Sequence, residues 1–291
     1  MLSEMNAAVL YGKEDVRIER VPIPAAGKGE IVIRVHAALT CGTDLKVFRR
    51  GYHARMIAPP ALFGHELAGV VHETGAGVRS FKPGMRVVAL NSAPCGVCYW
   101  CVRKQENLCE DLLFNNGAYA EYIRIPARIV AKNTLIVPES LPLEHAALTE
   151  PLACVVRGLE ETGAKRGDIV VVIGAGPIGL MFMHVAQLSG MKVIAVVKRD
   201  CPTCELTAPV LGELAQRVGL QVYTQDDPSF PETVPERIDD TALDFSHRLK
   251  IEIVPTLIQH VRGIYSRTLP QKKDQGINNE KEHNQNFHSA L

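Results

Sequence analysis

The sequence lacks an excess of charge of either sign. Among its 291 residues, Lys and Arg together number 32 and Asp and Glu also number 32, so the formal net charge is zero. Proteins that bind nucleic acid or anionic membranes through their phosphates normally carry a basic excess. The composition therefore predicts no nucleic-acid and no membrane partner, and it favours a small, roughly neutral substrate.

The sequence also lacks an apolar run of the ~20 residues that a membrane-spanning helix needs. Its first residues, MLSEMNAAVLYGKEDVRIER, do not combine a basic region with an apolar stretch, as secretion signals do. We therefore expect a cytoplasmic protein. At 291 residues and 46% hydrophobic content, two domains are expected rather than one.

Cysteines are plentiful for such a chain. Without a secretion signal they are not expected to form disulfides, because the cytosol keeps thiols reduced, so metal binding or redox chemistry is the expected use. The eight positions are Cys41, Cys95, Cys98, Cys101, Cys109, Cys154, Cys201 and Cys204.

The pattern of apolar residues changes twice along the chain. Residues 6–135 hold short β-branched runs separated by Gly/Pro turns, which predicts a barrel-like, all-β domain over residues 1–148. A helical period follows over Glu139–Glu161. Residues 168–197 then combine an apolar strand, a glycine turn, a helix and a second strand, which predicts the β-α-β start of a parallel sheet within a domain spanning 149–197.

Four of the cysteines, Cys95, Cys98, Cys101 and Cys109, form the pattern C-x2-C-x2-C-x7-C. This spacing can place four thiolates around one tetrahedral Zn²⁺ and leave no open coordination position, which is the property of a structural zinc site. An iron–sulfur cluster and a chance grouping of reduced cysteines are the alternatives.

Three further motifs accompany this group: CGTD at Cys41–Asp44, GHE at Gly64–Glu66 and TEPLAC at Thr149–Cys154. In order and approximate spacing, the chain resembles the zinc-containing medium-chain dehydrogenases of the alcohol and polyol type. The resemblance implies an α/β multi-domain protein with a GroES-like β-barrel catalytic domain over 1–148, one structural zinc and one catalytic zinc.

A catalytic zinc has about three protein ligands and an open position. The resemblance implies Cys41 and His65 as two ligands and a carboxylate as the third, either Glu66 or Glu150. The EP pair at Glu150 resembles the polyol and threonine branches of the family. We expect Glu150 to approach the metal and Glu66 to exchange with it.

The resemblance also implies a reaction, in which zinc lowers the pKa of a secondary alcohol or polyol so that hydride can pass to NAD or NADP. Thr43 would relay the proton and Asp44 would orient a zinc ligand. Lys46 stands where family members often continue the relay with a histidine.

GAGPIG at Gly174–Gly179 follows the expected strand and opens the expected helix. In a dinucleotide site, Gly174 would make the tight turn, Gly176 would allow close approach of the pyrophosphate, and Gly179 would pack helix on strand, with Pro177 and Ile178 between them. The helix N-terminus would then face the pyrophosphate.

The second strand should end in an acidic residue that binds the ribose, but Val197 stands there. Lys198 and Arg199 follow, either as ligands of an NADP 2′-phosphate or as solvated charges. The family's further β-α units are not recognisable after residue 197, so we expect a truncated Rossmann unit.

CPTC at Cys201–Cys204 follows a strand and opens a helix, which suits a redox dithiol with Cys201 as the attacking thiolate. An incidental or metal-binding pair is the alternative. Residues 198–264 resemble part of a thioredoxin-like fold, in which VPT at Val254–Thr256 would be the cis-proline loop. Residues 265–291 are polar and without periodicity, and we expect them to be disordered.

The leading hypothesis is therefore a zinc-dependent oxidoreductase that acts on a small alcohol or polyol with NAD or NADP. The rivals are a thiol–disulfide module that carries an inactive dehydrogenase domain, and a truncated, non-catalytic zinc-binding fusion. Whether the chain forms a homo-oligomer is left open by the sequence.

Overall fold

The computed structural model describes residues 3–249. These residues fall into two compact units, one that ends at Glu150 and one that begins at Pro151. The expected boundary lay between residues 148 and 149. Among the described residues, no helix has both the length and the apolar composition needed to cross a bilayer. The expected thioredoxin-like loop at Val254–Thr256 and the tail 265–291 lie outside the described residues.

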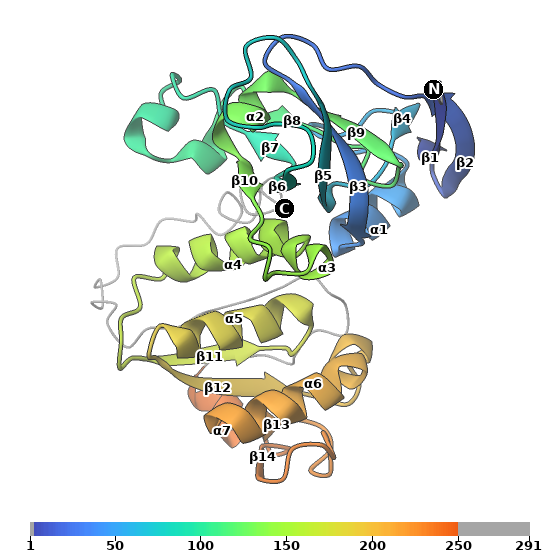
Figure 1. The fold of residues 1–291 in the computed structure, drawn as a ribbon. Helices are drawn as coiled ribbons and strands as arrows, with labels where there is room; N and C mark the ends of the chain where they lie inside the picture. The colour runs from blue at the N-terminus through green and yellow to red at the C-terminus, as the bar shows by residue number, and fades with distance from the viewer. Residues whose placement is uncertain (1–2, 250–291) are drawn as a thin grey trace, which may run out of the picture. The chain divides into compact units, whose positions relative to one another are not determined.

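The first unit contains three antiparallel sheets, with strand orders β2-β1-β4, β10-β6-β5-β3-β9 and β7-β8 (Figure 1). This part is rich in antiparallel strands, as expected, but it also contains helices, and its strands form separate sheets. Its elements are β1 (Glu4–Gly12), β2 (Asp15–Pro22), β3 (Ile31–Leu39), α1 (Gly42–Arg50), β4 (Ala61–Leu62), β5 (Glu66–Thr74), β6 (Arg86–Ala89), β7 (Ser92–Ala93), η1 (Cys101–Arg103), η2 (Glu106–Leu108), β8 (Leu113–Phe114), β9 (Tyr122–Ile125), α2 (Ala127–Lys132), β10 (Thr134–Ile136) and α3 (Leu143–Ala146).

Strands β3 and β5 form the centre of the largest sheet and position the site described below. Their β-branched and leucine side chains, including Ile31, Ile33 and Val71, pack in one buried cluster, which is what holds strands of this composition together. In the antiparallel register Leu39 pairs with Glu66. The residues that immediately follow β3 and precede β5 are therefore brought to the same end of the sheet.

The helical period over Glu139–Glu161 corresponds to two helices rather than to one. The first is α3, and the second, α4 (Thr149–Glu161), begins in the first unit and continues in the second. Pro151 has no N–H to donate to the carbonyl of Ala147, so a helix cannot run through this point unbroken. The Thr149 hydroxyl instead donates to the carbonyl of Ala146 at 2.7 Å.

The second unit is built on a parallel sheet of order β11-β12-β13-β14. Both helical crossovers run in the same direction along the sheet, so α5 and α6 pack on the same face and contact each other (Figure 1). After the end of α4 its elements are β11 (Ile169–Ile173), α5 (Pro177–Leu188), β12 (Lys192–Val197), α6 (Pro202–Val218), β13 (Gln221–Thr224), β14 (Arg237–Asp239) and α7 (Asp244–Arg248).

The sheet does not end at Val197, where the nucleotide-type unit was expected to stop. Strand β13 pairs in parallel with β12, and β14 pairs in parallel with β13. The buried side chains of β11, β12, α5 and α6 share one hydrophobic core with Val222 of β13. Residues 198–249 therefore extend the sheet begun by β11 and β12 and are not a separate unit.

Candidate functional site

Three potential zinc ligands meet at the end of strands β3 and β5. The thiol of Cys41, the imidazole of His65 and the carboxylate of Glu66 each offer a ligand atom, and these atoms all lie within 4.8 Å of one another. His65 and Glu66 are buried, and Cys41 is half-buried. Glu66 is thus the carboxylate that joins Cys41 and His65, and Glu150 does not belong to this group of three.

Cys41 is held by the helix that it begins. It is the N-cap residue of α1, and its sulfur accepts the backbone N–H of Thr43 at 3.2 Å. Its own backbone N–H donates to Asp44 Oδ2 at 3.0 Å, which completes a reciprocal capping pair. The conformation of the CGTD segment therefore fixes where the sulfur points. Thr43 and Lys46 both lie half-buried on α1.

Asp44 orients His65. Its buried carboxylate oxygen Oδ1 lies 2.9 Å from His65 Nδ1, while His65 Nε2 lies 3.4 Å from Cys41 Sγ. With the Nδ1 proton directed to Asp44, Nε2 is the nitrogen left for a metal. The orienting role predicted for Asp44 is the role that this geometry supports.

Tyr119 supports Asp44 and was not predicted as a site residue. Its hydroxyl donates to Asp44 Oδ2 at 2.8 Å and also lies 3.0 Å from Thr40 Oγ1. The aromatic ring fits because residue 64 is glycine: a Cβ at Gly64 would lie 2.6 Å from the ring. The GHE motif thus makes room for Tyr119, but no feature of the sequence connects positions this far apart.

The two carboxyl groups and the imidazole near this site have shifted pKa values. Burial, followed by repulsion from Glu150, raises the pKa of Glu66 to about 7, and burial also raises the pKa of Glu150. Burial opposes protonation of His65, but its hydrogen bonds with Asp44 and Cys41 prevail and raise its pKa to about 11. The 3.4 Å contact of Cys41 Sγ with His65 Nε2 places side by side two groups that ligate metal in their deprotonated forms.

The donor atoms fit zinc. For Zn–S near 2.3 Å and Zn–N near 2.0 Å, a tetrahedral angle separates sulfur and nitrogen by roughly 3.5 Å. Cys41 Sγ and His65 Nε2 are 3.4 Å apart. One thiolate, one imidazole and one carboxylate also form the ligand type of a catalytic zinc with an open position.

We expect Asp44→Asn to weaken zinc binding at this site by about 10–100-fold, the usual effect of losing a partner that orients a ligand histidine. The Asp44 carboxylate accepts bonds from His65, from the Cys41 backbone and from Tyr119. An asparagine amide nitrogen cannot accept any of them. The measurement is competition for zinc with a chelator, with Asp15→Asn on exposed strand β2 as the control. Equal zinc affinity in both variants would show that Asp44 does not orient the ligand.

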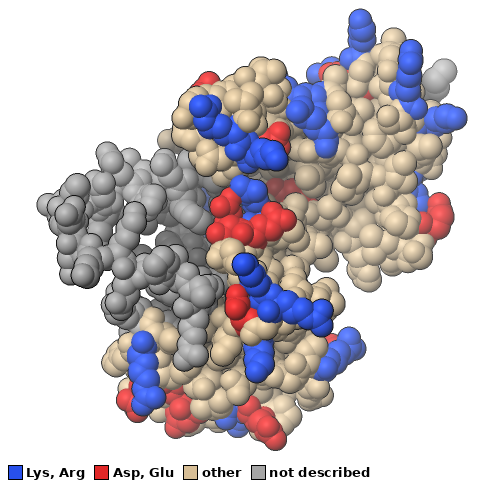
Figure 2. Space-filling view, turned by 90° about the vertical axis from the view of Figure 1, so that its left-hand side faces the viewer, with Lys and Arg blue, Asp and Glu red and all other residues tan. Residues whose placement is uncertain are grey.

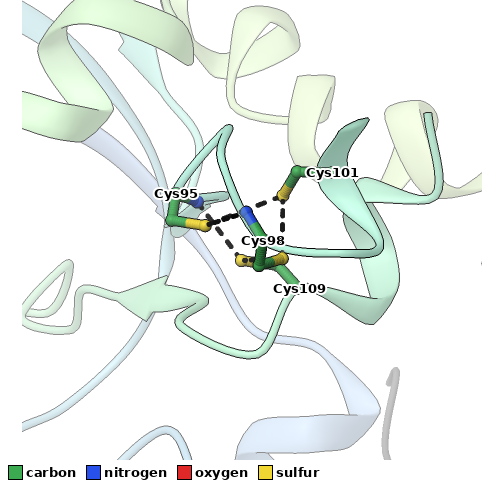
Figure 3. A group of neighbouring side chains, drawn as sticks. All are labelled: Cys95, Cys98, Cys101 and Cys109. Atoms are coloured by element: carbon green, nitrogen blue, oxygen red, sulfur yellow. Dashed lines mark hydrogen bonds between the residues drawn. The ribbon is translucent and has the colours of Figure 1, made fainter. Parts of the chain in front are cut away.

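The second group consists of the four cysteines of the C-x2-C-x2-C-x7-C pattern, which lie between β7 and β8 and within η1 (Figure 3). Their sulfur atoms all lie within 4.8 Å of one another. Backbone N–H groups of the same loop point at the sulfurs: Val97 and Cys98 donate to Cys95, and Cys95 donates to Cys109. The loop therefore surrounds the four thiols with donors that stabilise negative charge.

The sulfur spacing matches a tetrahedral zinc site. Four sulfurs at about 2.3 Å from one zinc lie roughly 3.8 Å from each other. The sulfur–sulfur distances are 3.9 Å for Cys95–Cys101, 3.5 Å for Cys98–Cys101 and 3.9 Å for Cys98–Cys109. With all four positions taken by protein, such a site holds the loop and offers no place for a substrate.

The glycine turn lies in the second unit, between β11 and α5. Gly174 adopts a left-handed conformation with φ of +89°, and a Cβ on Gly179 would lie 2.2 Å from the carbonyl oxygen of Gly174. These two glycines thus make the tight turn and the close helix–strand contact expected of them. Pro177 occupies the first turn of α5 and Gly176 is its N-cap. Beside Gly176, however, stands a methyl group of Thr203, 2.9 Å from where a Cβ would be.

The residues after β12 are engaged with acidic partners. Arg199 forms ion pairs with Asp227 and Glu232, and Lys198 lies 3.6 Å from Asp200. They are therefore neither simply solvated nor free to receive a 2′-phosphate. The turn thus has the glycines expected of a pyrophosphate site, with Thr203 packed beside Gly176, while Val197 stands where the ribose-binding acidic residue was expected.

Comparisons with known proteins show what this chain is similar to. The alcohol dehydrogenase GroES-like domain matches residues 27–139. The chain is 38% identical over 195 residues to an L-threonine 3-dehydrogenase of Bacillus licheniformis, which covers 65% of this chain and 55% of that enzyme. It is 33% identical over 221 residues to a sorbitol dehydrogenase of Bacillus subtilis, which covers 74% of this chain and 59% of that enzyme.

Among solved structures, a zinc-binding dehydrogenase from Sinorhizobium meliloti bound to NADP matches with a TM-score of 0.67 and 30% identity, covering 84% of this chain and 64% of that one. A 2R,3R-butanediol dehydrogenase from Bacillus subtilis matches with a TM-score of 0.61 and 25% identity, covering 81% of this chain and 78% of that one. The chain thus spans little more than half the length of the two enzymes matched by sequence.

Proposed function

We propose that this chain, whose residues 27–139 match the alcohol dehydrogenase GroES-like domain, transfers hydride between a secondary alcohol or polyol and NAD or NADP. The single observation that carries the proposal is the meeting of Cys41, His65 and Glu66 at the end of β3 and β5. We propose two zinc ions per chain, a catalytic one at this site and a structural one among the four cysteines.

When bound, zinc would supply a Lewis acid that lowers the pKa of the substrate hydroxyl, and the nicotinamide would accept the hydride. The chain's own residues prepare the site for this chemistry. Cys41 and His65 would hold the metal, and the contact of Asp44 with His65 Nδ1 would leave Nε2 free to be the ligand. Repulsion between Glu66 and Glu150 favours one carboxylate at the metal at a time, which supports the proposed exchange between them.

We assign the proton relay to the hydroxyl of Thr43, because its backbone N–H already binds the sulfur of Cys41 and so holds the residue beside the site. Lys46 lies one turn further along α1.

The surface agrees with a small, uncharged substrate. On the face shown in Figure 2, basic and acidic side chains alternate in small patches, and neither sign forms a continuous field there. Together with a net charge of zero, this favours an alcohol or polyol over a phosphorylated or polymeric substrate. The test is NAD(P)H formation by the full chain with threonine, sorbitol and butanediol, each with NAD and with NADP.

Thr203 narrows the approach to the proposed pyrophosphate site, so we expect Thr203→Ala to tighten NADH or NADPH binding about 3–10-fold, or about 1 kcal/mol. The reason is that its methyl group lies beside Gly176, the glycine at which a dinucleotide pyrophosphate would approach the backbone closely. Binding is measured by the fluorescence of the reduced nucleotide, with Thr241→Ala, on an exposed loop, as the control. A weaker or unchanged affinity in Thr203→Ala would contradict this placement.

We further propose, as the resemblance suggested, that residues 198–264 derive from a thioredoxin-like segment. The observation that supports this is local: a strand, β12, leads directly into a CxxC pair at the start of α6, and β13 pairs in parallel with β12. The test is a structure of the full chain that shows whether Val254–Thr256 faces the CxxC pair.

A further inference from the structure

The two cysteines of CPTC lie outside every metal group described above and are arranged as a pair. Cys201 is the N-cap residue of α6, a helix of 17 residues, and its sulfur accepts the backbone N–H of Cys204 at 3.3 Å. Both are free thiols, and both are buried, with exposed fractions of 5% for Cys201 and 0% for Cys204. The turn between them, at Pro202, is exposed.

The surroundings lower the pKa of one thiol of the pair and raise that of the other. The hydrogen bond from the Cys204 thiol is the largest influence on Cys201. Burial opposes it, but the N–H groups of Cys204 and Thr203 and the charge of Lys198 add to it, and together they lower the pKa of Cys201 to about 6. The same hydrogen bond and burial raise the pKa of Cys204. A thiolate at a helix N-terminus with a protonated partner one turn later is the arrangement of a nucleophile and a resolving thiol.

The segment that holds the pair also contacts the glycine turn between β11 and α5. The sulfur of Cys204 accepts the backbone N–H of Ala175, and the hydroxyl of Thr207 donates to the carbonyl of Ala175. Thr203, between the two cysteines, packs on Gly176. The start of α6 is thus fixed to the loop between β11 and α5 at three points, which keeps the two sulfurs in place.

We propose that Cys201 and Cys204 form a redox-active dithiol that reduces small-molecule disulfides. The substrate is small because Cys201 itself is nearly enclosed, although its chain neighbours Asp200 and Pro202 are exposed. This activity depends on the second unit alone and requires neither zinc ion, so it stands or falls separately from the dehydrogenase proposed above.

The reaction proceeds in two exchanges. The Cys201 thiolate attacks one sulfur of the disulfide, a bond forms between Cys201 and that sulfur, and the other half leaves as a thiolate that takes up a proton. Cys204 then loses its proton and attacks Cys201 Sγ, which releases the second half as a thiol. Overall, the two cysteines are oxidised to one disulfide while the substrate disulfide is reduced to two thiols. A small dithiol such as dithiothreitol returns the protein to its starting state.

The experiment exposes the reduced, zinc-loaded full chain to oxidised glutathione and maps the products by peptide mass spectrometry. Wild type should form a Cys201–Cys204 disulfide, and Cys204→Ser should accumulate a mixed disulfide between Cys201 and glutathione. Cys201→Ser should form neither, whereas Cys154→Ser should behave as wild type. Wild-type protein without the internal disulfide, or Cys204→Ser without glutathione on Cys201, would overturn the proposal.

A second measurement uses wild type alone and so does not depend on the folding of a variant. The rate at which iodoacetamide alkylates Cys201 should rise with pH through about 6 and level off near neutral pH, since the thiolate is the reactive form. A rate that still climbs through ~8.5, the ordinary thiol range, would show that Cys201 is not activated.

Discussion

Cys41→Ser should reduce kcat/KM for alcohol oxidation by at least about 10³-fold, which corresponds to roughly 4 kcal/mol of lost transition-state stabilisation. The substitution removes the thiolate from the group formed with His65 and Glu66. Cys41 is the N-cap residue of α1, and its sulfur accepts the backbone N–H of Thr43. A serine hydroxyl at this position can accept the same bond, so the helix keeps its N-cap. The expected loss is therefore one of metal binding and not of folding.

Zinc analysis separates these two outcomes. Cys41→Ser should retain one zinc per chain at the four-cysteine loop and lose the other, while its thermal midpoint stays close to that of wild type. Cys154→Ser, a cysteine substitution away from both metal groups, is the matched control and should keep both ions and full activity. A Cys41→Ser protein with wild-type activity would remove Cys41 from the catalytic site.

Cys98→Ser should destabilise the first unit by several kcal/mol and release the structural zinc. Zinc bound by four thiolates contributes directly to folding, since the unfolded chain offers no preformed site. The sulfur of Cys98 lies 3.5 Å from the sulfur of Cys101 and 3.9 Å from that of Cys109. Removing it leaves the four-cysteine group with three sulfur ligands. We expect the thermal midpoint of the first unit to fall by about 10 °C or more.

The measurement is calorimetry of wild type and Cys98→Ser, each with and without a chelator. Chelation should lower the midpoint of wild type towards that of the variant, and it should change the variant much less. If the chelator removed zinc from wild type without shifting the midpoint, the four-cysteine loop would have no structural role.

The grouping of the candidate zinc ligands could largely be predicted from the sequence, because most of these residues lie close together in the chain. The four-cysteine loop is a single short segment, and its ligand spacing is set by local geometry. CGTD is likewise local, since Cys41 caps the helix that contains Asp44. Cys41 and His65 meet because β3 pairs with β5. The resemblance to a family implied that these two residues meet, but the residues alone did not predict the strand pairing.

Features that depend on long-range packing were not predictable. Tyr119 reaches Asp44 across many intervening residues, and its fit depends on the missing side chain of Gly64. Sequence spacing also could not decide between two carboxylates, and it is Glu66 that joins the group of three. The contact of Thr203 with Gly176 arises because α5 and α6 pack on the same face of a sheet that continues past Val197.

The most direct test of the central claim is to remove and restore the catalytic zinc in the full chain while following NAD(P)H formation from a secondary alcohol or polyol. We predict that mild chelation removes one zinc per chain and abolishes NAD(P)H formation, and that one equivalent of zinc restores it. A chain that carries both zinc ions and forms no NAD(P)H from any such alcohol would contradict the account.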